Sequence, residues 1–276
     1  MKDADCIAFL QWALPQLRLR WPGYRKVRRQ VCKRVERRMK ALSIESLDDY
    51  RRRLETHPEE WDVLDGFTRI TISRFFREHD AFEYLCDTAL PALRELAAPD
   101  PVQVWSAGCA GGEEAYTLVI AAHEQGIPLH VVGTDSDAHQ LERARRASYS
   151  AGCLKDLPAP WRDASFAQQG ESFALHDELR ACVELLHQDI RKEMPNGPFH
   201  LILCRYLAFT YFDRPLQLYI AGRLLERTIP DGWVVLGKHE SWPSDVPGLA
   251  EVRPGLRVYR VSRGSQLIDS RQENRR

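Results

Sequence analysis

The sequence has no long hydrophobic run. No stretch reaches the roughly 18 apolar residues that a membrane-spanning helix needs, and the first ten residues carry Asp3 and Asp5, where a secretory signal would be basic. Hydrophobic residues make up 44% and charged residues 28% of the chain, proportions typical of soluble globular proteins. We therefore expect a cytoplasmic protein that does not insert into a membrane.

Paired cysteines and metal-ligand spacings are also lacking. The seven cysteines include no Cys-x-x-Cys pair and have an odd total, which indicates reduced thiols in a cytosol. The histidines that could have bound a metal show no ligand spacing on one helix; they are His123, His130, His187, His200 and His239. We expect no metal site.

The formal net charge of the chain is zero, because 39 Lys and Arg residues balance 39 Asp and Glu residues. The balance hides an asymmetry: Arg18 to Lys40 contains eleven basic residues and a single acid, Glu36. Two interpretations stay open, a solvated helix face and a docking surface for an acidic partner. Nucleic acid is not the expected partner, since only Trp21 and Tyr24 supply aromatic rings there and the segment fits no nucleic-acid module.

The N-terminal part has helical periodicity. Apolar residues recur three or four positions apart, which predicts three helices, and Ser46 with Asp49 resembles a capping box at the start of the third. The apolar positions are Ile7, Leu10, Leu14 and Leu17, then Val27, Val31, Val35, Met39 and Leu42, then Leu47, Tyr50 and Leu54.

After Pro99-Asp100-Pro101 short apolar runs alternate with helical stretches, which predicts an α/β domain with a doubly wound parallel sheet. The expected strands are 102–106, 129–134, 182–187, 199–204, 232–237 and 256–261, and the expected helices are 113–124, 138–147 and 216–227. The polar stretch 148–181 is too long for a simple loop and predicts an inserted subdomain. The polar tail 263–276 is expected to be disordered.

The most informative stretch runs from Val104 to Glu114. It combines a strand, a glycine-rich turn and an acidic helix start, the arrangement that binds nucleotides at the carboxyl end of a parallel strand. No Lys with Ser or Thr follows the glycines, and Glu113 and Glu114 would repel phosphate. A cation such as the sulfonium of S-adenosylmethionine would suit the loop. The alternative is that the two acids only complement the helix dipole.

Asp135 follows the second predicted strand. An acid at this place can bind the two hydroxyls of a ribose, which supports a nucleoside ligand. The same residue could instead cap the next helix.

Several motifs, taken in order, resemble the CheR-type glutamate methyltransferases, which methylate chemoreceptors. The likeness covers residues 5 to 262. It is carried by Thr71-Ile72-Ser73-Arg74-Phe75-Phe76-Arg77-Glu78, Trp105-Ser106-Ala107 with Gly112-Glu113-Glu114, Thr134-Asp135, Ala144 to Tyr149, Cys204-Arg205, Tyr211-Phe212-Asp213 and Gly237-Lys238-His239-Glu240.

The resemblance implies a class I methyltransferase fold. It implies an all-helical N-terminal domain at 1–80, an S-adenosylmethionine-binding domain at 81–262 and a small inserted β-subdomain at 148–181. The basic helix 25–40 matches the position that docks on an acidic helical substrate such as a chemoreceptor cytoplasmic domain. We expect a monomer that converts S-adenosylmethionine to S-adenosylhomocysteine.

The resemblance also implies roles for individual residues. The cofactor positions are Thr71, Ser73, Arg77, Gly108, Glu114, Asp135, Asp189, Ile190, Arg205 and Tyr206, and the residues near the transferred methyl are Arg77 and Tyr211. Tyr206 stands where the family has Asn, and Thr71 and Ser73 replace Asn and Thr.

The chemistry expected for such a protein needs no general base, because a glutamate with a pKa of about 4.3 is already ionised at neutral pH. Arg77 would orient that carboxylate, and Phe75, Phe76, Tyr211 and Phe212 would exclude water. Two other functions stay open: a methyltransferase for another protein or small molecule, and a non-catalytic module that binds S-adenosylmethionine or docks to receptors.

Overall fold

The computed structural model describes residues 2–262, so the tail expected to be disordered lies outside the described residues. The chain divides into two compact units. The first comprises Met1–Ile72 and Tyr206–Gln217, and the second comprises Ser73–Arg205 and the residues from Leu218 onward. Among residues 2–262, no helix is long and apolar enough to cross a membrane.

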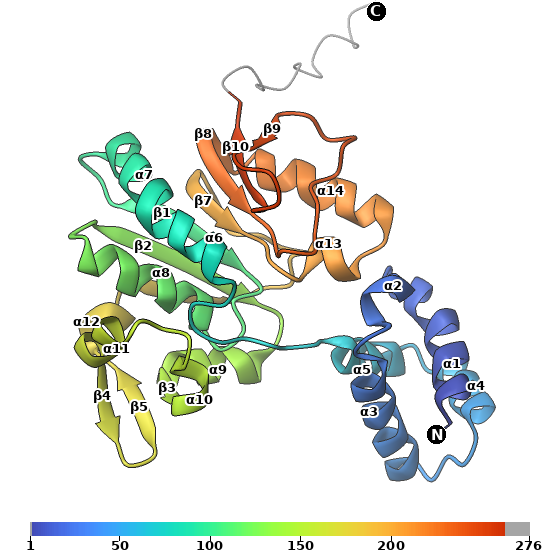
Figure 1. Cartoon of the computed structure of the whole chain (residues 1–276). Helices are drawn as coiled ribbons and strands as arrows, with labels where there is room; N and C mark the ends of the chain where they lie inside the picture. Colours follow the sequence, from blue (N-terminus) through green and yellow to red (C-terminus); the bar gives the residue numbers. More distant parts are fainter. Residues whose placement is uncertain (1, 263–276) are drawn as a thin grey trace, which may run out of the picture. The chain divides into compact units, whose positions relative to one another are not determined.

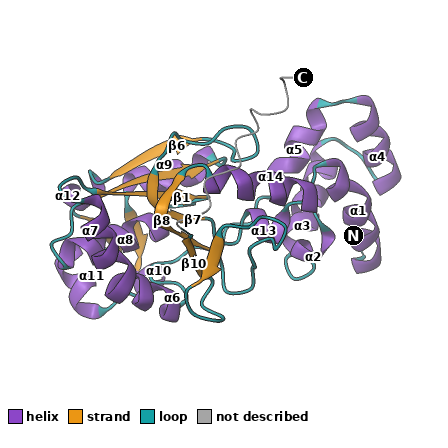
Figure 2. Cartoon of the chain, turned by 90° about the horizontal axis from the view of Figure 1, so that it is seen from above, coloured by secondary structure: helices purple, strands orange, loops and turns teal. Residues whose placement is uncertain are grey.

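The first unit is helical (Figure 2). Its elements are α1 (Asp3–Gln16), α2 (Trp21–Tyr24), α3 (Arg28–Ala41), α4 (Leu47–Thr56), α5 (Glu59–Thr68) and α13 (Ala208–Tyr211). The three expected helices are confirmed as α1, α3 and α4. Helix α5 was not predicted, because its mixed apolar and acidic residues and Gly66 give a weak periodic signal.

The ends and contacts of these helices have local causes. The predicted cap is confirmed, since the Ser46 hydroxyl accepts a hydrogen bond from the Asp49 amide at 3.1 Å. The expectation that all thiols are reduced is wrong for Cys6 and Cys32, which form a disulfide between α1 and α3. The two cysteines are 26 residues apart, and only the packing of the two helices brings them together.

A buried polar cluster joins α3, α4 and α5. Glu60 is 1% exposed, and its carboxylate accepts hydrogen bonds from Arg38 Nη2 at 2.8 Å, the Tyr50 hydroxyl at 3.0 Å and Arg53 Nε at 3.5 Å. The hydrogen bond from Arg38 is the main reason that the pKa of Glu60 lies below its usual value. Because a buried carboxylate is costly without partners, this cluster fixes how the three helices pack.

The second unit is built on a seven-stranded sheet (Figure 1). Its order is β6-β2-β1-β7-β8-β10-β9, with β1 (Val102–Ala107), β2 (Leu129–Asp135), β6 (Val183–His187), β7 (Phe199–Leu203), β8 (Thr228–Val235), β9 (Leu249–Glu251) and β10 (Val258–Val261). The pairs from β6 to β8 are parallel, and β10 is antiparallel to both neighbours. The predicted doubly wound sheet is confirmed.

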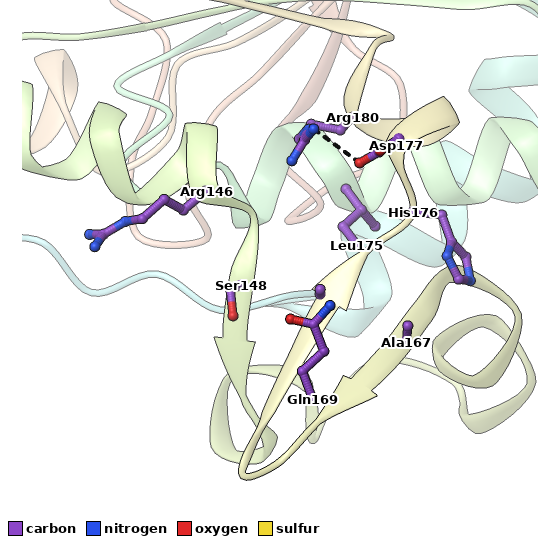
Figure 3. A pocket seen from close by; sticks show the side chains of 9 residues that line it. Arg146, Ser148, Ala167, Gln169, Leu175, His176, Asp177 and Arg180 are labelled. Atoms are coloured by element: carbon purple, nitrogen blue, oxygen red, sulfur yellow. Dashed lines mark ion pairs between the residues drawn. The ribbon is translucent and has the colours of Figure 1, made fainter.

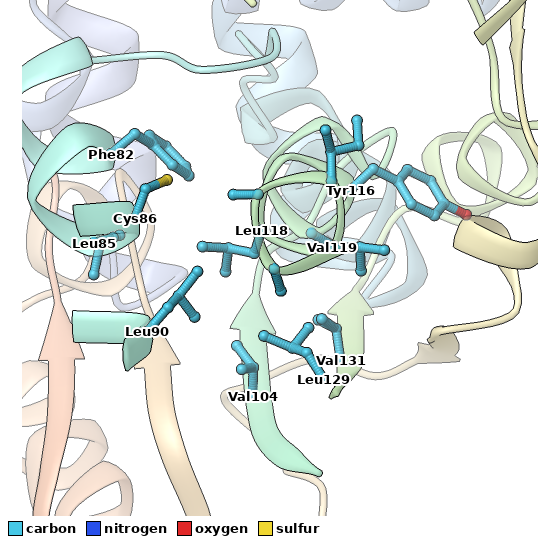
Figure 4. Packing of buried hydrophobic residues seen from close by; sticks show 14 of the residues in the cluster. Phe82, Leu85, Cys86, Leu90, Val104, Tyr116, Leu118, Val119, Leu129 and Val131 are labelled. Carbon is cyan, nitrogen blue, oxygen red and sulfur yellow. The ribbon is translucent and has the colours of Figure 1, made fainter. Parts of the chain in front are cut away.

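Helices of the second unit cover this sheet. They are α6 (His79–Tyr84), a π-helical turn η1 (Leu85–Ala89), α7 (Leu90–Ala97), α8 (Glu113–Glu124), α9 (Ala138–Arg146) and α14 (Arg214–Leu225), which begins in the first unit. Figure 4 shows Leu118 and Val119 of α8 between the strand residues Val104, Leu129 and Val131 and the side chains of α6 to α7. The apolar faces of the predicted β1, β2 and α8 therefore meet, in one core, the helices from α6 to α7, which were not predicted.

The segment between α9 and β6 forms a separate small sheet. Antiparallel strands pair in the order β3-β5-β4, from Ser148–Ser150, Ser172–Leu175 and Phe166–Gln169. The short helices α10 (Ala151–Leu154), α11 (Ala159–Ser165) and α12 (Asp177–Arg180) accompany it. This is the expected inserted β-subdomain.

Candidate functional site

The candidate site lies where the parallel strands of the second unit end. The register aligns Ala107 at the end of β1 with Thr134 in β2, and it aligns Asp135 with His187 at the end of β6. The loops that follow β1, β2, β6 and β7 therefore leave the same edge of the sheet. β1 lies between β2 and β7, where the chain changes its winding direction and ligands of such sheets bind.

The loop after β1 needs unusual backbone conformations. Gly108 and Gly112 have φ values of 75° and 85°, which glycine adopts without a steric penalty. The amides of Gly108 and Cys109 both donate to the Thr134 carbonyl, at 2.7 and 2.9 Å. The loop thus bends sharply from β1 against the end of β2.

Asp135 holds this loop in place. Its Oδ2 accepts a hydrogen bond from the Ala110 amide at 2.9 Å, and its Oδ1 accepts one from the Asp137 amide at 2.8 Å. The carboxylate is half-buried at the end of β2. The cap of α9 belongs instead to Asp137, whose side chain accepts from the His139 amide at 2.9 Å, so Asp135 is not the helix cap that the sequence left open.

The two acids at the start of α8 are less available than the sequence implied. Glu113 is fully buried and pairs with Arg143. Glu114 accepts from the Ser106 hydroxyl at 2.8 Å and from Arg205 Nη1 at 2.9 Å. Protein cations therefore already neutralise much of the charge that we expected to attract a ligand. These partners are distant in the sequence, so the acidic pattern alone could not reveal them.

Arg205 follows β7 and lies in the interior of the second unit. Its side chain is 4% exposed and pairs with Glu78 at 2.8 Å and Glu114 at 2.9 Å. Its guanidinium also lies over the Phe82 ring, 5.0 Å from the centroid. Burial lowers the pKa of Arg205, but the two carboxylates outweigh burial and hold it above its usual value. A direct contact between Arg205 and the cofactor stays a prediction.

Arg77 lies beside this cluster. Its carbonyl accepts a hydrogen bond from Arg205 Nη2 at 2.9 Å, and the residue is half-buried. The structure therefore brings Arg77, Glu114 and Arg205, three of the predicted site residues, into one hydrogen-bonded cluster. Glu78 completes the cluster and was not among the predicted site residues, because its role depends on Arg205, 127 residues further along the chain.

The neighbouring phenylalanines have a different role from the one expected. Phe75 and Phe76 are 0% and 4% exposed. Phe75 packs edge-on against Tyr149 and Phe166, with ring centroids 4.8 and 5.5 Å apart. The expectation that these two rings line a substrate pocket is wrong, because they belong to the core between the large sheet and the inserted subdomain.

The loop after β6 carries Asp189 and Ile190. Asp189 accepts a hydrogen bond from Arg191 Nη2 at 2.6 Å, and its side chain is 16% exposed. Ile190 is buried. Both residues follow the strand next to β2, at the same sheet edge as Asp135.

Ser73 is the first residue of the second unit and is half-buried. Three other predicted site residues, Thr71, Tyr206 and Tyr211, belong to the first unit. Thr71 is exposed, and the Tyr211 ring packs against Tyr24 at 5.0 Å between centroids. Tyr206 has a φ of 55°, a left-handed conformation that Asn adopts more readily than bulky residues.

The basic segment of the first unit presents a stripe of cations on α3 and the turn before it. Five of the exposed residues form what we call the basic stripe: Lys26 in the turn, and Arg29, Lys33, Arg37 and Lys40 on α3. The spacing of three and four residues places the four cations of α3 on one helix face. The opposite face buries Val31, Val35 and Met39, and Arg28 and Arg38 pair with Asp3 and Glu60. Only part of the basic charge is therefore free of internal ion pairs.

A pocket of about 400 Å³ lies on the inserted subdomain (Figure 3). Arg146, Ser148, Gln169, His176 and Arg180 are among its lining residues, and Arg180 pairs with Asp177 at 3.0 Å. None of the predicted site residues lines it.

A hydrogen bond joins the inserted subdomain to the glycine-rich loop after β1. The Tyr149 hydroxyl of β3 donates to the Gly111 carbonyl at 2.6 Å, and the Arg143 guanidinium lies 5.5 Å from the centroid of the Tyr149 ring. Sequence reasoning missed Tyr149 and Arg143. A signal was present in the family-like stretch from Ala144 to Tyr149, but it gave no partner. Among residues 2–262, no cluster of three or more His, Cys, Asp or Glu could hold a metal ion.

Comparison with known families gives two matches. Residues 71–255 match the model of the CheR methyltransferase S-adenosylmethionine-binding domain, and residues 26–64 match that of the CheR methyltransferase all-alpha domain. The first match contains the glycine loop, Asp135, Asp189 and Arg205.

The chain is also similar to curated proteins that are named as methyltransferases. The chain is 29% identical over 222 residues to chemotaxis protein methyltransferase 2 of Pseudomonas aeruginosa, covering 77% of this chain and 78% of that protein. It is 29% identical over 249 residues to the chemotaxis protein methyltransferase of Salmonella typhimurium, covering 86% and 83%. A probable biofilm formation methyltransferase of Pseudomonas aeruginosa is 27% identical over 256 residues, covering 85% of this chain and 60% of that protein.

Proposed function

Because the chain belongs to the CheR methyltransferase family, we propose that it transfers the methyl group of S-adenosylmethionine to glutamate side chains of chemoreceptor proteins. The family match over residues 71–255 carries the proposal, since it spans the glycine loop and every strand end that forms the candidate site. The names of the relatives from Pseudomonas aeruginosa and Salmonella typhimurium support a chemotaxis substrate. The domain ranges 1–80 and 81–262, a monomeric state and a cytoplasmic location remain part of the proposal.

The residues at the sheet edge fit a nucleoside cofactor. Asp135 supplies a half-buried carboxylate that can accept the hydroxyls of a ribose, while the φ values of Gly108 and Gly112 let the backbone come close to a ligand. Asp189 and Ile190 lie in the loop beside Asp135, where an adenine would follow the ribose. Thr71, Ser73, Glu114, Arg205 and Tyr206 are the remaining cofactor positions that the family resemblance proposes.

When bound, the sulfonium of the cofactor supplies an electrophilic methyl group. The chain itself must hold a glutamate carboxylate in line with that methyl, since positioning is the main contribution that a protein can make to such a displacement. An ionised carboxylate needs no base, so the histidines need no catalytic role.

Arg77 is the residue that we propose for orienting the substrate. A guanidinium matches a carboxylate in a bidentate geometry, and Arg77 is half-buried beside the buried cluster of Glu78, Glu114 and Arg205. Tyr211 is the second residue proposed near the transferred methyl, on the family resemblance alone.

The basic stripe is the proposed docking surface for the receptor. Four exposed cations on one face of α3, together with Lys26 in the turn before it, suit an acidic helical bundle. Exposed charges are screened over about 8 Å at physiological ionic strength, so docking should weaken as salt increases.

The direct test is incubation of the purified chain with labelled S-adenosylmethionine and a chemoreceptor cytoplasmic fragment. Label should enter base-labile glutamyl methyl esters. Arg77→Ala should lose most of this transfer and keep the wild-type melting temperature. Absence of esters with several receptor fragments, despite tight binding of S-adenosylhomocysteine, would reject the proposed substrate, and full activity of Arg77→Ala would reject the role of Arg77.

A further inference from the structure

We propose that Glu78 is a positioning residue, whose carboxylate, held by the buried Arg205, fixes the backbone segment that presents Arg77 to the substrate. We call Phe76–Glu78 the hook. The inference rests on the proposed function, because it takes Arg77 as the residue that orients the substrate carboxylate.

The hook has an unfavourable backbone. Phe76 and Glu78 have φ values of 53° and 68°, in the left-handed region that residues with a Cβ rarely adopt. Arg77 lies between these two strained residues. Such a conformation persists only when the surroundings hold it, and strain of this kind concentrates at functional sites.

Two sets of contacts supply that restraint. On the N-terminal side, the Phe76 amide donates to the Thr117 hydroxyl of α8 at 3.1 Å, and the Phe76 ring is buried. On the C-terminal side, Arg205 Nη2 donates both to the Arg77 carbonyl at 2.9 Å and to Glu78 Oε2 at 2.8 Å. The main chain of Arg77 is therefore held from both sides.

Glu78 connects three segments of the second unit. Besides pairing with Arg205, its Oε2 accepts a hydrogen bond from the Lys238 amide at 3.2 Å, in the loop after β8. Its side chain is 16% exposed, against 4% for Arg205. A group that is shielded from water and bound from two directions can hold the hook against both β7 and the loop after β8.

The charge of Glu78 can be removed without leaving Arg205 unpaired. Arg205 Nη1 still pairs with Glu114 at 2.9 Å, and the guanidinium stays over the Phe82 ring. In Glu78→Gln the amide keeps the shape of the side chain but replaces an ion pair by a weaker hydrogen bond from the Arg205 cation to a neutral oxygen. The cluster should remain folded while the hook becomes looser.

A looser hook should affect the chemical step more than cofactor binding. A displacement of about 1 Å in a group that orients a reactant can reduce the rate by roughly 100-fold. Arg205, itself a proposed cofactor position, keeps its ion pair with Glu114 in Glu78→Gln. Asp135 and the glycines of the loop after β1 supply none of the atoms that hold the hook. The structure therefore predicts a lower kcat with nearly unchanged affinity for S-adenosylhomocysteine.

The experiment compares Glu78→Gln with wild type, Arg77→Ala and the control Glu83→Gln, which removes an exposed carboxylate from α6. Methyl transfer to a receptor fragment is measured over a range of fragment concentrations, and S-adenosylhomocysteine binding is measured by calorimetry. We expect kcat of Glu78→Gln to fall by roughly 10- to 100-fold, with the dissociation constant within threefold of wild type. Glu83→Gln should match wild type.

Several results would overturn the inference. Wild-type kcat in Glu78→Gln, with Arg77→Ala inactive, removes the role of Glu78 and leaves the proposed function intact. Equal losses of kcat and cofactor affinity would show a general structural effect. A wild-type protein that methylates no receptor fragment fails the proposed function instead.

Amide hydrogen exchange tests the same inference without activity. The Phe76 and Lys238 amides should be protected in the wild-type protein, and their exchange should accelerate in Glu78→Gln. Unprotected amides in the wild type would overturn the inference even if Glu78→Gln does not fold, and unchanged protection in a folded Glu78→Gln would do the same.

Discussion

Replacing Asp135 by alanine should sharply weaken binding of S-adenosylhomocysteine. A hydrogen bond to a charged acceptor contributes about 1.5 to 3 kcal/mol, so the loss of two ribose hydroxyl contacts should cost roughly 3 kcal/mol, or about 100-fold in affinity. The variant also loses the bond from the Ala110 amide at 2.9 Å. Ala110 has a φ of 51°, so the loop should lose order as well, and 100-fold is a lower bound.

Calorimetry with S-adenosylhomocysteine measures this effect, and Asp137 offers a matched control. Asp137 lies two residues away, and its side chain caps α9. Asp137→Ala should lose about 1 kcal/mol of stability, as expected for a lost cap, with affinity within twofold of wild type. An Asp135→Ala variant that binds as tightly as wild type, or an Asp137→Ala variant that binds as weakly as Asp135→Ala, would refute the assignment of the ribose to Asp135.

Three further predictions concern the first unit. Tyr206→Asn should raise the unfolding free energy by about 1 kcal/mol, because Asn tolerates the left-handed backbone better; a lower melting temperature would contradict this. Glu60→Gln should reduce the unfolding free energy in urea by about 2 kcal/mol at pH 7, against about 1 kcal/mol for Tyr50→Phe. The pKa of Glu60 is lowered by folding, so its contribution is fully present above about pH 4.3 and is lost as the pH falls through the folded-state pKa; a pH-independent difference between Glu60→Gln and wild type would refute it. Lys33→Glu with Arg37→Glu should raise KM for a receptor fragment about 10-fold at low salt and less at high salt, and a KM independent of salt would exclude docking through the stripe.

Local patterns in the sequence were enough to predict most of the fold. Alternating apolar runs predicted β1, β2, β6, β7, β8 and β10, and the glycines between β1 and α8 predicted a sharp turn at the sheet edge. These features depend on neighbouring residues, because hydrophobic periodicity and glycine φ values are local properties. The capping box at Ser46 was predictable for the same reason.

The partners of charged residues were not predictable. Glu114 pairs with Arg205, 91 residues away, and Glu113 pairs with Arg143, 30 residues away. The residues around Glu113 and Glu114 give no sign that an arginine forms an ion pair with each of these carboxylates. The disulfide between Cys6 and Cys32 and the burial of Phe75 likewise depend on how distant elements pack.

The hydrogen bond from Tyr149 to the Gly111 carbonyl limits how freely the insert can vary. A foreign insert grafted between α9 and β6 would have to bring a tyrosine at the middle position of its first strand, where Tyr149 lies in β3. Without one, the graft would leave the buried Gly111 carbonyl in the loop after β1 without its donor, and the Arg143 guanidinium without its aromatic neighbour. Chimeras that exchange this insert between relatives should therefore keep their affinity for S-adenosylmethionine only when the new insert contains the tyrosine.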